Sequence, residues 1–130
     1  MTPDNRHKHM IVRAEISSPP IGELGKAFVT NWIKNLIDRI GMKILHGPVS
    51  IYCQVEGNRG MTAFTVIETS HIALHTWDEC NPAVLQLDVY TCSELNVDDV
   101  LDEIKAFSPS KVEYKYLDRE TCLIEVTANV

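Results

Sequence analysis

The sequence has few of the features that mark membrane, secreted or metal-clustering proteins. No apolar run reaches the roughly 18 residues needed to span a bilayer, and the start, MTPDNRHKHM, lacks the apolar centre of a secretory signal. The four cysteines, Cys53, Cys80, Cys92 and Cys122, form no CxxC pair, which argues against a zinc knuckle or a thioredoxin-type motif. We therefore expect a cytoplasmic protein with free thiols, no membrane segment and no bound metal.

Basic residues are also in short supply. Twelve Lys and Arg stand against eighteen Asp and Glu, which gives a net charge of -6. A phosphate-binding surface usually carries the opposite sign, so nucleic acid and anionic membrane surfaces are disfavoured as partners. With 130 residues, 45% of them hydrophobic, the chain suits a single domain over residues 1–130 with a real core. Residues 1–8 are polar and predict a loose tail, in which His7 and the adjoining His9 are solvated.

Hydrophobic periodicity predicts two amphipathic helices. The first ends at Gly41, which suits a C-terminal cap, and its apolar stripe contains Leu24, Phe28, Trp32, Leu36 and Ile40. The second begins at the N-cap residue Asn96 and ends at Ser108-Pro109. Apolar and β-branched segments around them predict strands, one of them interrupted near Pro48; these are His9–Ile16, Met42–Glu56, Met61–Glu68, His71–Trp77, Val84–Thr91, Lys111–Leu117 and Cys122–Thr127.

The order of these elements predicts the fold class. Consecutive strands joined by short turns form a mostly antiparallel sheet, and two amphipathic helices can cover only one face of it. We therefore expect an α+β protein, a two-layer αβ sandwich with both helices on one face. The other face of the sheet, which carries no helix, is called the helix-free face below.

The hairpin of His71–Trp77 and Val84–Thr91 shows two different faces. Its apolar residues alternate with polar ones, so the apolar set should face the helices. The helix-free face would then gather His71, His75, Trp77, Gln86, Asp88, Tyr90 and Cys92.

The register of this hairpin decides which residues meet. If Trp77 pairs with Val84, Thr69 falls opposite Cys92, and Ser70 lies within the roughly 4.5–8 Å that separates cross-strand neighbours of Cys92. A slip of one residue would exchange the two faces and is disfavoured, whereas a slip of two stays open. The same register pairs His75 with Gln86 and His71 with Tyr90.

Two interpretations of this polar face stay open at this point. Solvation explains scattered polar residues, whereas Trp77, Tyr90 and Cys92 on one face fit burial by a partner or ligand better. A shared zinc is disfavoured, because His71 and His75 would lie about 13 Å apart along a strand at about 3.3 Å per residue. A serine hydrolase is disfavoured because Ser70 is not part of a G-x-S-x-G elbow.

Two stretches resemble the prokaryotic S-adenosylmethionine decarboxylase family. They are Glu68–Glu79, ETSHIALHTWDE, and Leu87–Cys92, LDVYTC. That family carries Glu-Ser-His, then His-Thr-Trp-Pro-Glu, then Asp-Val-Phe-Thr-Cys-Gly. The N-terminal strand with His9, the long first helix and the chain length also agree with it.

The resemblance implies a two-layer αβ sandwich and a pyruvoyl enzyme. Ser70 matches the serine that attacks the carbonyl of the preceding residue, here Thr69, so that the chain cleaves between them and leaves a pyruvoyl group derived from Ser70. That ketone is an electron sink for loss of CO₂ from S-adenosylmethionine in polyamine (spermidine) biosynthesis. His75 matches the histidine that moves protons during processing, and Thr62 falls where the family has a serine that assists it. Cys92 matches the cysteine that reprotonates the decarboxylated carbon.

The resemblance also implies partners. Small prokaryotic members are oligomeric, so we expect a homodimer or a higher homo-oligomer formed through the helix-free face. Glu68, His71 and Tyr90, which lie beside Ser70 in the predicted hairpin, are expected to contact the substrate.

The chain departs from the family pattern near the processing site. Thr69 replaces Glu, Thr62-Ala63 replaces Ser-Gly, Asp78 replaces Pro, Ser93 replaces Gly, and two extra residues lie between Trp77 and Asp88. Two alternatives therefore stay open. One is an unprocessed, non-catalytic homologue that binds a ligand or a paralogue, and the other is a decarboxylase of another amino acid such as ornithine or arginine.

Overall fold

The computed structural model describes residues 7–126. The elements follow the predicted order. Their bounds are β1 Lys8–Ile16, α1 Gly22–Arg39, β2 Ile44–Cys53, β3 Gly60–Ile67, β4 Ser70–Trp77, β5 Ala83–Thr91, α2 Val97–Ile104, a 3₁₀ turn Lys105–Phe107, β6 Pro109–Asp118 and β7 Ile124–Glu125. Residues 1–6 of the predicted tail lie outside the described residues, and β1 begins at Lys8, one residue inside that tail, because Lys8 pairs with both Thr91 and Asp118.

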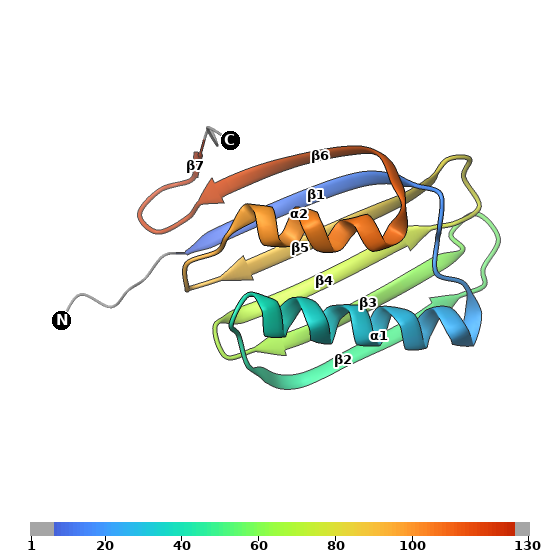
Figure 1. Ribbon diagram of the computed structural model, residues 1–130, viewed down its shortest axis with the longest axis horizontal. Coiled ribbons are helices and arrows are strands. Elements are labelled where there is room, and N and C mark those ends of the chain that lie inside the picture. Colours follow the sequence, from blue (N-terminus) through green and yellow to red (C-terminus); the bar gives the residue numbers. More distant parts are fainter. Residues whose placement is uncertain (1–6, 127–130) are drawn as a thin grey trace.

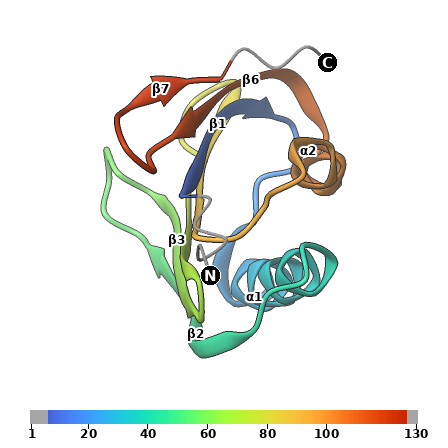
Figure 2. The ribbon, with the colours of Figure 1, turned by 90° about the vertical axis from the view of Figure 1, so that its left-hand side faces the viewer.

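The strands form one antiparallel sheet, and both helices lie against the same face of it (Figures 1 and 2). The sheet order is β2-β3-β4-β5-β1-β6-β7, so the N-terminal strand lies between β5 and β6. This arrangement confirms the predicted α+β sandwich with helices on one side. Among the described residues, no helix is both long enough and apolar enough to cross a membrane.

Helix α1 packs along the sheet through the later part of its apolar stripe. Trp32 and Leu36 are buried, and the Trp32 Nε1–H donates to the Glu103 carbonyl at 2.8 Å, which ties α1 to α2. The first part of the predicted stripe is a correction, because Leu24 is 87% exposed and Phe28 is 43% exposed. The buried side of the helix also contains Gly25, Val29, Ile33 and Ile37, and the predicted stripe leaves it at Leu24 because residues spaced by four drift around a helix of about 3.6 residues per turn.

Alternation along the strands fills the core from the sheet side. On β5, Leu85, Leu87 and Val89 are fully buried, and on β4 the same holds for Ile72 and Leu74. Their neighbours on the helix-free face are half-buried or exposed. The two faces of the predicted hairpin are therefore confirmed, and the helix-free face stays open in the chain described here.

The edges of the sheet differ from the predicted bounds. Strand β2 is shorter than the predicted segment, and its pairing with β3 shifts register on both sides of His46, close to the predicted interruption at Pro48. Strand β7 has only two residues where a longer strand over Cys122–Thr127 was expected, and Thr127 itself lies outside the described residues.

Candidate functional site

The register of the central hairpin is the predicted one. Trp77 pairs with Val84, and Ser70 pairs with Thr91 at the other end of the strands. Beyond this last pair, the Cys92 backbone N–H donates to the Thr69 carbonyl at 2.8 Å. The Ser70 Oγ lies 3.5 Å from the Cys92 Sγ. The structure therefore brings the predicted serine and cysteine together where β4 begins and β5 ends.

Ser70 has an unusual backbone conformation. Residues 68 and 69 form the turn between β3 and β4, and Ser70 follows with a φ of +141°. Side-chain-bearing residues rarely adopt this region, which favours glycine, and holding one there costs about 1–3 kcal/mol. Such strain persists only where the surrounding contacts enforce it, and it gathers at functional sites.

Thr69 is held by contacts on its side chain as well as on its carbonyl. Its Oγ1–H donates to the Met42 Sδ at 3.1 Å and its Oγ1 accepts a hydrogen bond from the Thr91 hydroxyl at 3.0 Å. Thr91 is fully buried, and its Oγ1 accepts the Ser93 backbone N–H at 3.0 Å. The loop after α1, the β3–β4 turn and the end of β5 therefore meet at one end of the molecule (Figure 1).

Thr62 and His75 form a second pair on the helix-free face. They are cross-strand partners, and the Thr62 Oγ1 lies 3.2 Å from the His75 Nδ1. The imidazole also stacks on Trp77, with ring centroids 6.0 Å apart. His75 lies five positions after Ser70 along β4, which is about 16 Å at about 3.3 Å per residue. Within one chain, the predicted site is thus divided into two pairs that do not touch.

The expected substrate residues lie near Ser70, and sequence reasoning missed some of their neighbours. His71 and Tyr90 are cross-strand partners with ring centroids 5.6 Å apart. The Tyr90 ring also contacts His9, at 5.5 Å between centroids, and the Arg119 guanidinium lies 4.3 Å from its centroid. Glu68 is exposed in the turn, and its backbone N–H donates to the Lys43 carbonyl.

His9 is a correction, because its side chain is only 17% exposed rather than solvated. Its Nδ1 lies 3.2 Å from the Arg119 guanidinium, which can only donate, so the ring proton sits on Nε2. That Nε2 is buried and has no hydrogen-bond partner. Burial lowers the pKa of His9, against the opposing pull of Asp88. The pairing of β1 with β5 places His9 opposite Tyr90. A local sequence pattern cannot predict this contact, because the two residues are far apart in the sequence.

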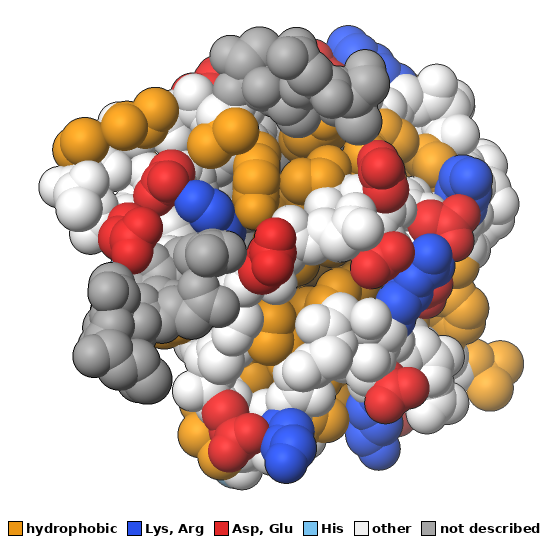
Figure 3. Space-filling model, turned by 60° about the vertical axis from the view of Figure 1, so that its left-hand side comes forward, with side chains coloured by type: hydrophobic (Ala, Val, Ile, Leu, Met, Phe, Trp, Pro, Cys, Tyr) orange, Lys and Arg blue, Asp and Glu red, His pale blue; other side chains and the backbone are white. Residues whose placement is uncertain are grey.

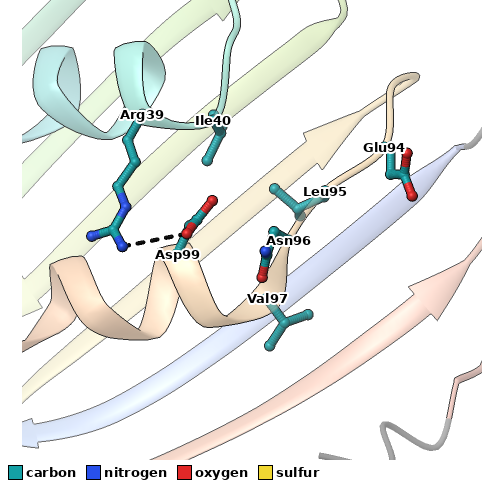
Figure 4. Close-up of a pocket in the computed structure, with 7 residues that line it drawn as sticks. All are labelled: Arg39, Ile40, Glu94, Leu95, Asn96, Val97 and Asp99. Atoms are coloured by element: carbon teal, nitrogen blue, oxygen red, sulfur yellow. Dashed lines mark ion pairs between the residues drawn. The ribbon is translucent and has the colours of Figure 1, made fainter.

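A hollow of about 530 Å³ lies on the helix side of the sheet, between the end of α1 and the start of α2. Figure 4 shows Arg39 reaching from α1 toward Asp99 on α2, an ion pair of 3.3 Å. On the face seen in Figure 3, acidic and basic side chains are interspersed, and patches of apolar surface lie among them. Within residues 7–126, no group of three or more His, Cys, Asp or Glu side chains could hold a metal ion.

Comparison with known proteins identifies one family that this chain resembles over most of its length. The sequence profile described as S-adenosylmethionine decarboxylase matches residues 24–120. The chain is 39% identical over 64 residues to the S-adenosylmethionine decarboxylase proenzyme of Pyrobaculum arsenaticum, a match that covers 48% of this chain and 50% of that protein. It is 42% identical over 57 residues to the proenzyme of the same name from Methanococcus vannielii, covering 42% of this chain and 45% of that protein. The matched part thus spans about half the length of these curated relatives.

A solved structure shares the fold. The adenosylmethionine decarboxylase from Aquifex aeolicus superposes with a TM-score of 0.63, covering 97% of this chain and 99% of that one. The sequence identity of that pair is 19%, so the superposition establishes a common architecture.

Proposed function

The chain belongs to the S-adenosylmethionine decarboxylase family, and from this premise we propose that it is a proenzyme. It cleaves itself between Thr69 and Ser70 and then decarboxylates S-adenosylmethionine for polyamine synthesis. The observation that carries the proposal is the strained Ser70, with a φ of +141°, whose hydroxyl lies beside Cys92. A turn at this place suits glycine, so a serine here indicates a use for the hydroxyl.

The contacts around the scissile peptide fit an acyl shift from nitrogen to oxygen. The Ser70 hydroxyl oxygen adds to the Thr69 carbonyl carbon, and the hydroxyl proton passes to the Ser70 nitrogen as the C–N bond breaks. The charge that develops on the Thr69 oxygen is met by the Cys92 N–H, which already donates to it at 2.8 Å. Such a preorganised donor stabilises a developing oxyanion.

The ester formed in this way leads to the prosthetic group by elimination. A base removes the Ser70 α-proton, the bond from Cβ to the ester oxygen breaks, and Thr69 leaves as a carboxylate. Water then replaces the nitrogen of the remaining enamine, releasing ammonia and leaving a pyruvoyl group at the new N-terminus. This group supplies the electron sink for loss of CO₂.

Cys92 and the neighbouring rings have roles in the decarboxylation. The Cys92 thiol, 3.5 Å from the Ser70 hydroxyl, is within reach of the reacting carbon and returns a proton to it. His71 and Tyr90 present ring faces beside this point and contact the substrate, together with Glu68 from the turn. The same proposal includes a cytoplasmic location. It is supported by the four cysteines, which are free thiols, as is usual in a reducing compartment.

The proton-transfer group for processing comes from a second copy of the chain. His75 lies about 16 Å along β4 from Ser70 in its own chain, beyond the reach of an imidazole. The helix-free face exposes the apolar side chains of Ile11, Ile51, Phe64 and Val66, and the partners of Phe64 and Val66 on β4 lie between His75 and Ser70. Packing two such faces together in opposite directions buries this surface and brings the Thr62–His75 pair of one copy toward the Ser70–Cys92 pair of the other. We therefore propose a homodimer with two composite sites.

The first experiment is the intact mass of the purified full chain under denaturing conditions. Self-cleavage gives fragments of residues 1–69 and 70–130, the second beginning with a pyruvoyl group. The Ser70→Ala variant is the control and stays whole. A wild-type chain that stays whole after prolonged incubation overturns the proposal and favours a non-catalytic, ligand-binding homologue. If the chain matures, a panel of S-adenosylmethionine, ornithine and arginine identifies the substrate by CO₂ release.

The composite site is tested by mixing two defective chains. A His75→Asn chain should stay whole when expressed alone, because its partner then lacks the imidazole as well. Coexpression with a Ser70→Ala chain supplies an intact His75 from the other copy, and the His75→Asn chain should now be cleaved. Separate affinity tags identify which chain is cut. Cleavage of the His75→Asn chain alone at the wild-type rate, or no cleavage in the mixture, would overturn the composite arrangement.

The surface that forms the dimer is tested separately. Phe64→Glu places a charge on the helix-free face, where Phe64 is 43% exposed, and should shift the chain toward monomer in analytical ultracentrifugation. Leu24→Glu changes an even more exposed apolar residue on the helix layer and should leave the assembly unchanged. The opposite pattern would assign the interface to the helices.

A further inference from the structure

A series of hydrogen bonds between neighbouring side chains runs through Thr69, the residue that precedes the scissile bond. The Ser93 N–H donates to the Thr91 hydroxyl, which donates to the Thr69 hydroxyl, which donates to the Met42 Sδ. The three distances are 3.0, 3.0 and 3.1 Å. The Thr91 hydroxyl also lies 3.7 Å from the Met42 Sδ, but its bond to the Thr69 hydroxyl is the shorter of the two and takes its single proton.

This arrangement fixes Thr69 from two sides. The Cys92 N–H holds the carbonyl, and the Thr91 hydroxyl holds the side chain. Thr91 is the last residue of β5, where it is fully buried and pairs with Ser70, and Cys92 follows it directly. Because Thr69 cannot rotate freely, the strain of the turn falls on the next residue, Ser70, at a φ of +141°.

We infer that Thr91 is a positioning residue for self-cleavage, acting through the hydroxyl of Thr69. This inference rests on the proposed function. Thr91 does not touch the reacting atoms in this account; it holds the Thr69 carbonyl carbon in line with the Ser70 hydroxyl. It also gives the Thr69 side chain a defined role at a position where the family pattern has Glu.

The test compares cleavage rates of newly made full chains. Cell-free synthesis followed by a timed quench gives the fraction cleaved at Thr69–Ser70 for each variant. Thr91→Val keeps the size of the side chain and removes its hydroxyl, and it should slow cleavage about 10- to 100-fold, since a displacement of about 1 Å costs about 10²-fold. Thr91→Ser restores the hydroxyl and should cleave within about twofold of the wild type.

Thr65 offers a matched control, because it is also a fully buried strand threonine, but its hydroxyl has no hydrogen-bond partner. Thr65→Val should cleave at the wild-type rate. Thr69→Val removes the same bond from the other side and should be as slow as Thr91→Val, which provides a second route to the answer if one variant folds poorly. Thermal unfolding midpoints identify a variant that is slow only because it is unfolded.

A second readout separates positioning from general stability. Hydroxylamine attacks an ester but not an amide, so a pulse of hydroxylamine reports how much of the chain has undergone the acyl shift. The ester fraction should fall in folded Thr91→Val and return in Thr91→Ser. If the wild type cleaves and Thr91→Val cleaves equally fast, the positioning role is wrong while the proposed function stands. If the wild type never cleaves, both are wrong.

Discussion

The strain at Ser70 predicts an inverted ranking of glycine and alanine at this position. Ser70→Ala and Ser70→Gly both remove the hydroxyl, so neither can cleave, and their folding can be compared on the whole chain. Glycine relieves about 1–3 kcal/mol of backbone strain. It also adds about 0.5–1 kcal/mol of unfolded-state entropy cost. The balance favours Ser70→Gly by about 1 kcal/mol in the free energy of unfolding, whereas an unstrained position favours alanine by about 0.5–1 kcal/mol.

Urea unfolding at equal protein concentration measures this difference, since the proposed dimer would make stability depend on concentration. His71 supplies the control, because it is exposed, lies next to Ser70 in the same strand and has an ordinary negative φ. There, the alanine variant should be more stable than the glycine variant. If Ser70→Ala is the more stable of its pair as well, the backbone at Ser70 is not strained and the central support for self-cleavage is lost.

Three further predictions follow from buried polar groups. Thr65→Val should raise the free energy of unfolding by about 1 kcal/mol, because the Thr65 hydroxyl is buried without a partner. Thr76→Val should lower it by about 1–3 kcal/mol, because the Thr76 Oγ1 accepts the Met61 N–H at 2.9 Å and the variant leaves that donor unpaired; equal effects at the two positions in urea unfolding would contradict both. Since burial lowers the pKa of His9, the unfolded chain takes up a proton first as pH falls below the ordinary value of 6.5, so stability should decline in acid from there. A His9→Gln variant should show a flatter stability profile between pH 7 and 5, and an unchanged slope would remove His9 as the cause.

Much of the site geometry follows from the sequence because the hairpin has two unlike faces. A strand with a buried side cannot slip by one residue without moving every apolar side chain into solvent. The pattern around Leu74 and Leu87 therefore excludes a slip of one residue but not of two, and the observed register places Ser70 opposite Thr91. The same reasoning predicts the layers, since two helical stripes must share one face.

Other features depend on contacts that no local pattern contains. His9 is buried because β1 lies between β5 and β6, a neighbourhood set by the whole sheet. The separation of His75 from Ser70 could have been predicted from the sequence. The rise per residue that excludes a shared zinc for His71 and His75 also places His75 far from Ser70 along the strand.

The departures from the family pattern lie in two local networks that each satisfy their own hydrogen bonds. At the Ser70 end, Thr69 joins the chain of Thr91 and Met42. At the His75 end, Asp78 stands where the family has proline, and its fully buried carboxylate accepts from the Tyr52 hydroxyl and the Arg59 guanidinium. Pairing of such buried groups stabilises the fold whether or not the chain is processed, because an unpaired buried donor or charge is costly. Thr69 and Asp78 therefore each lie in a satisfied network beside one half of the divided site, and cleavage of the intact chain, rather than its stability, decides between a proenzyme and a non-catalytic homologue.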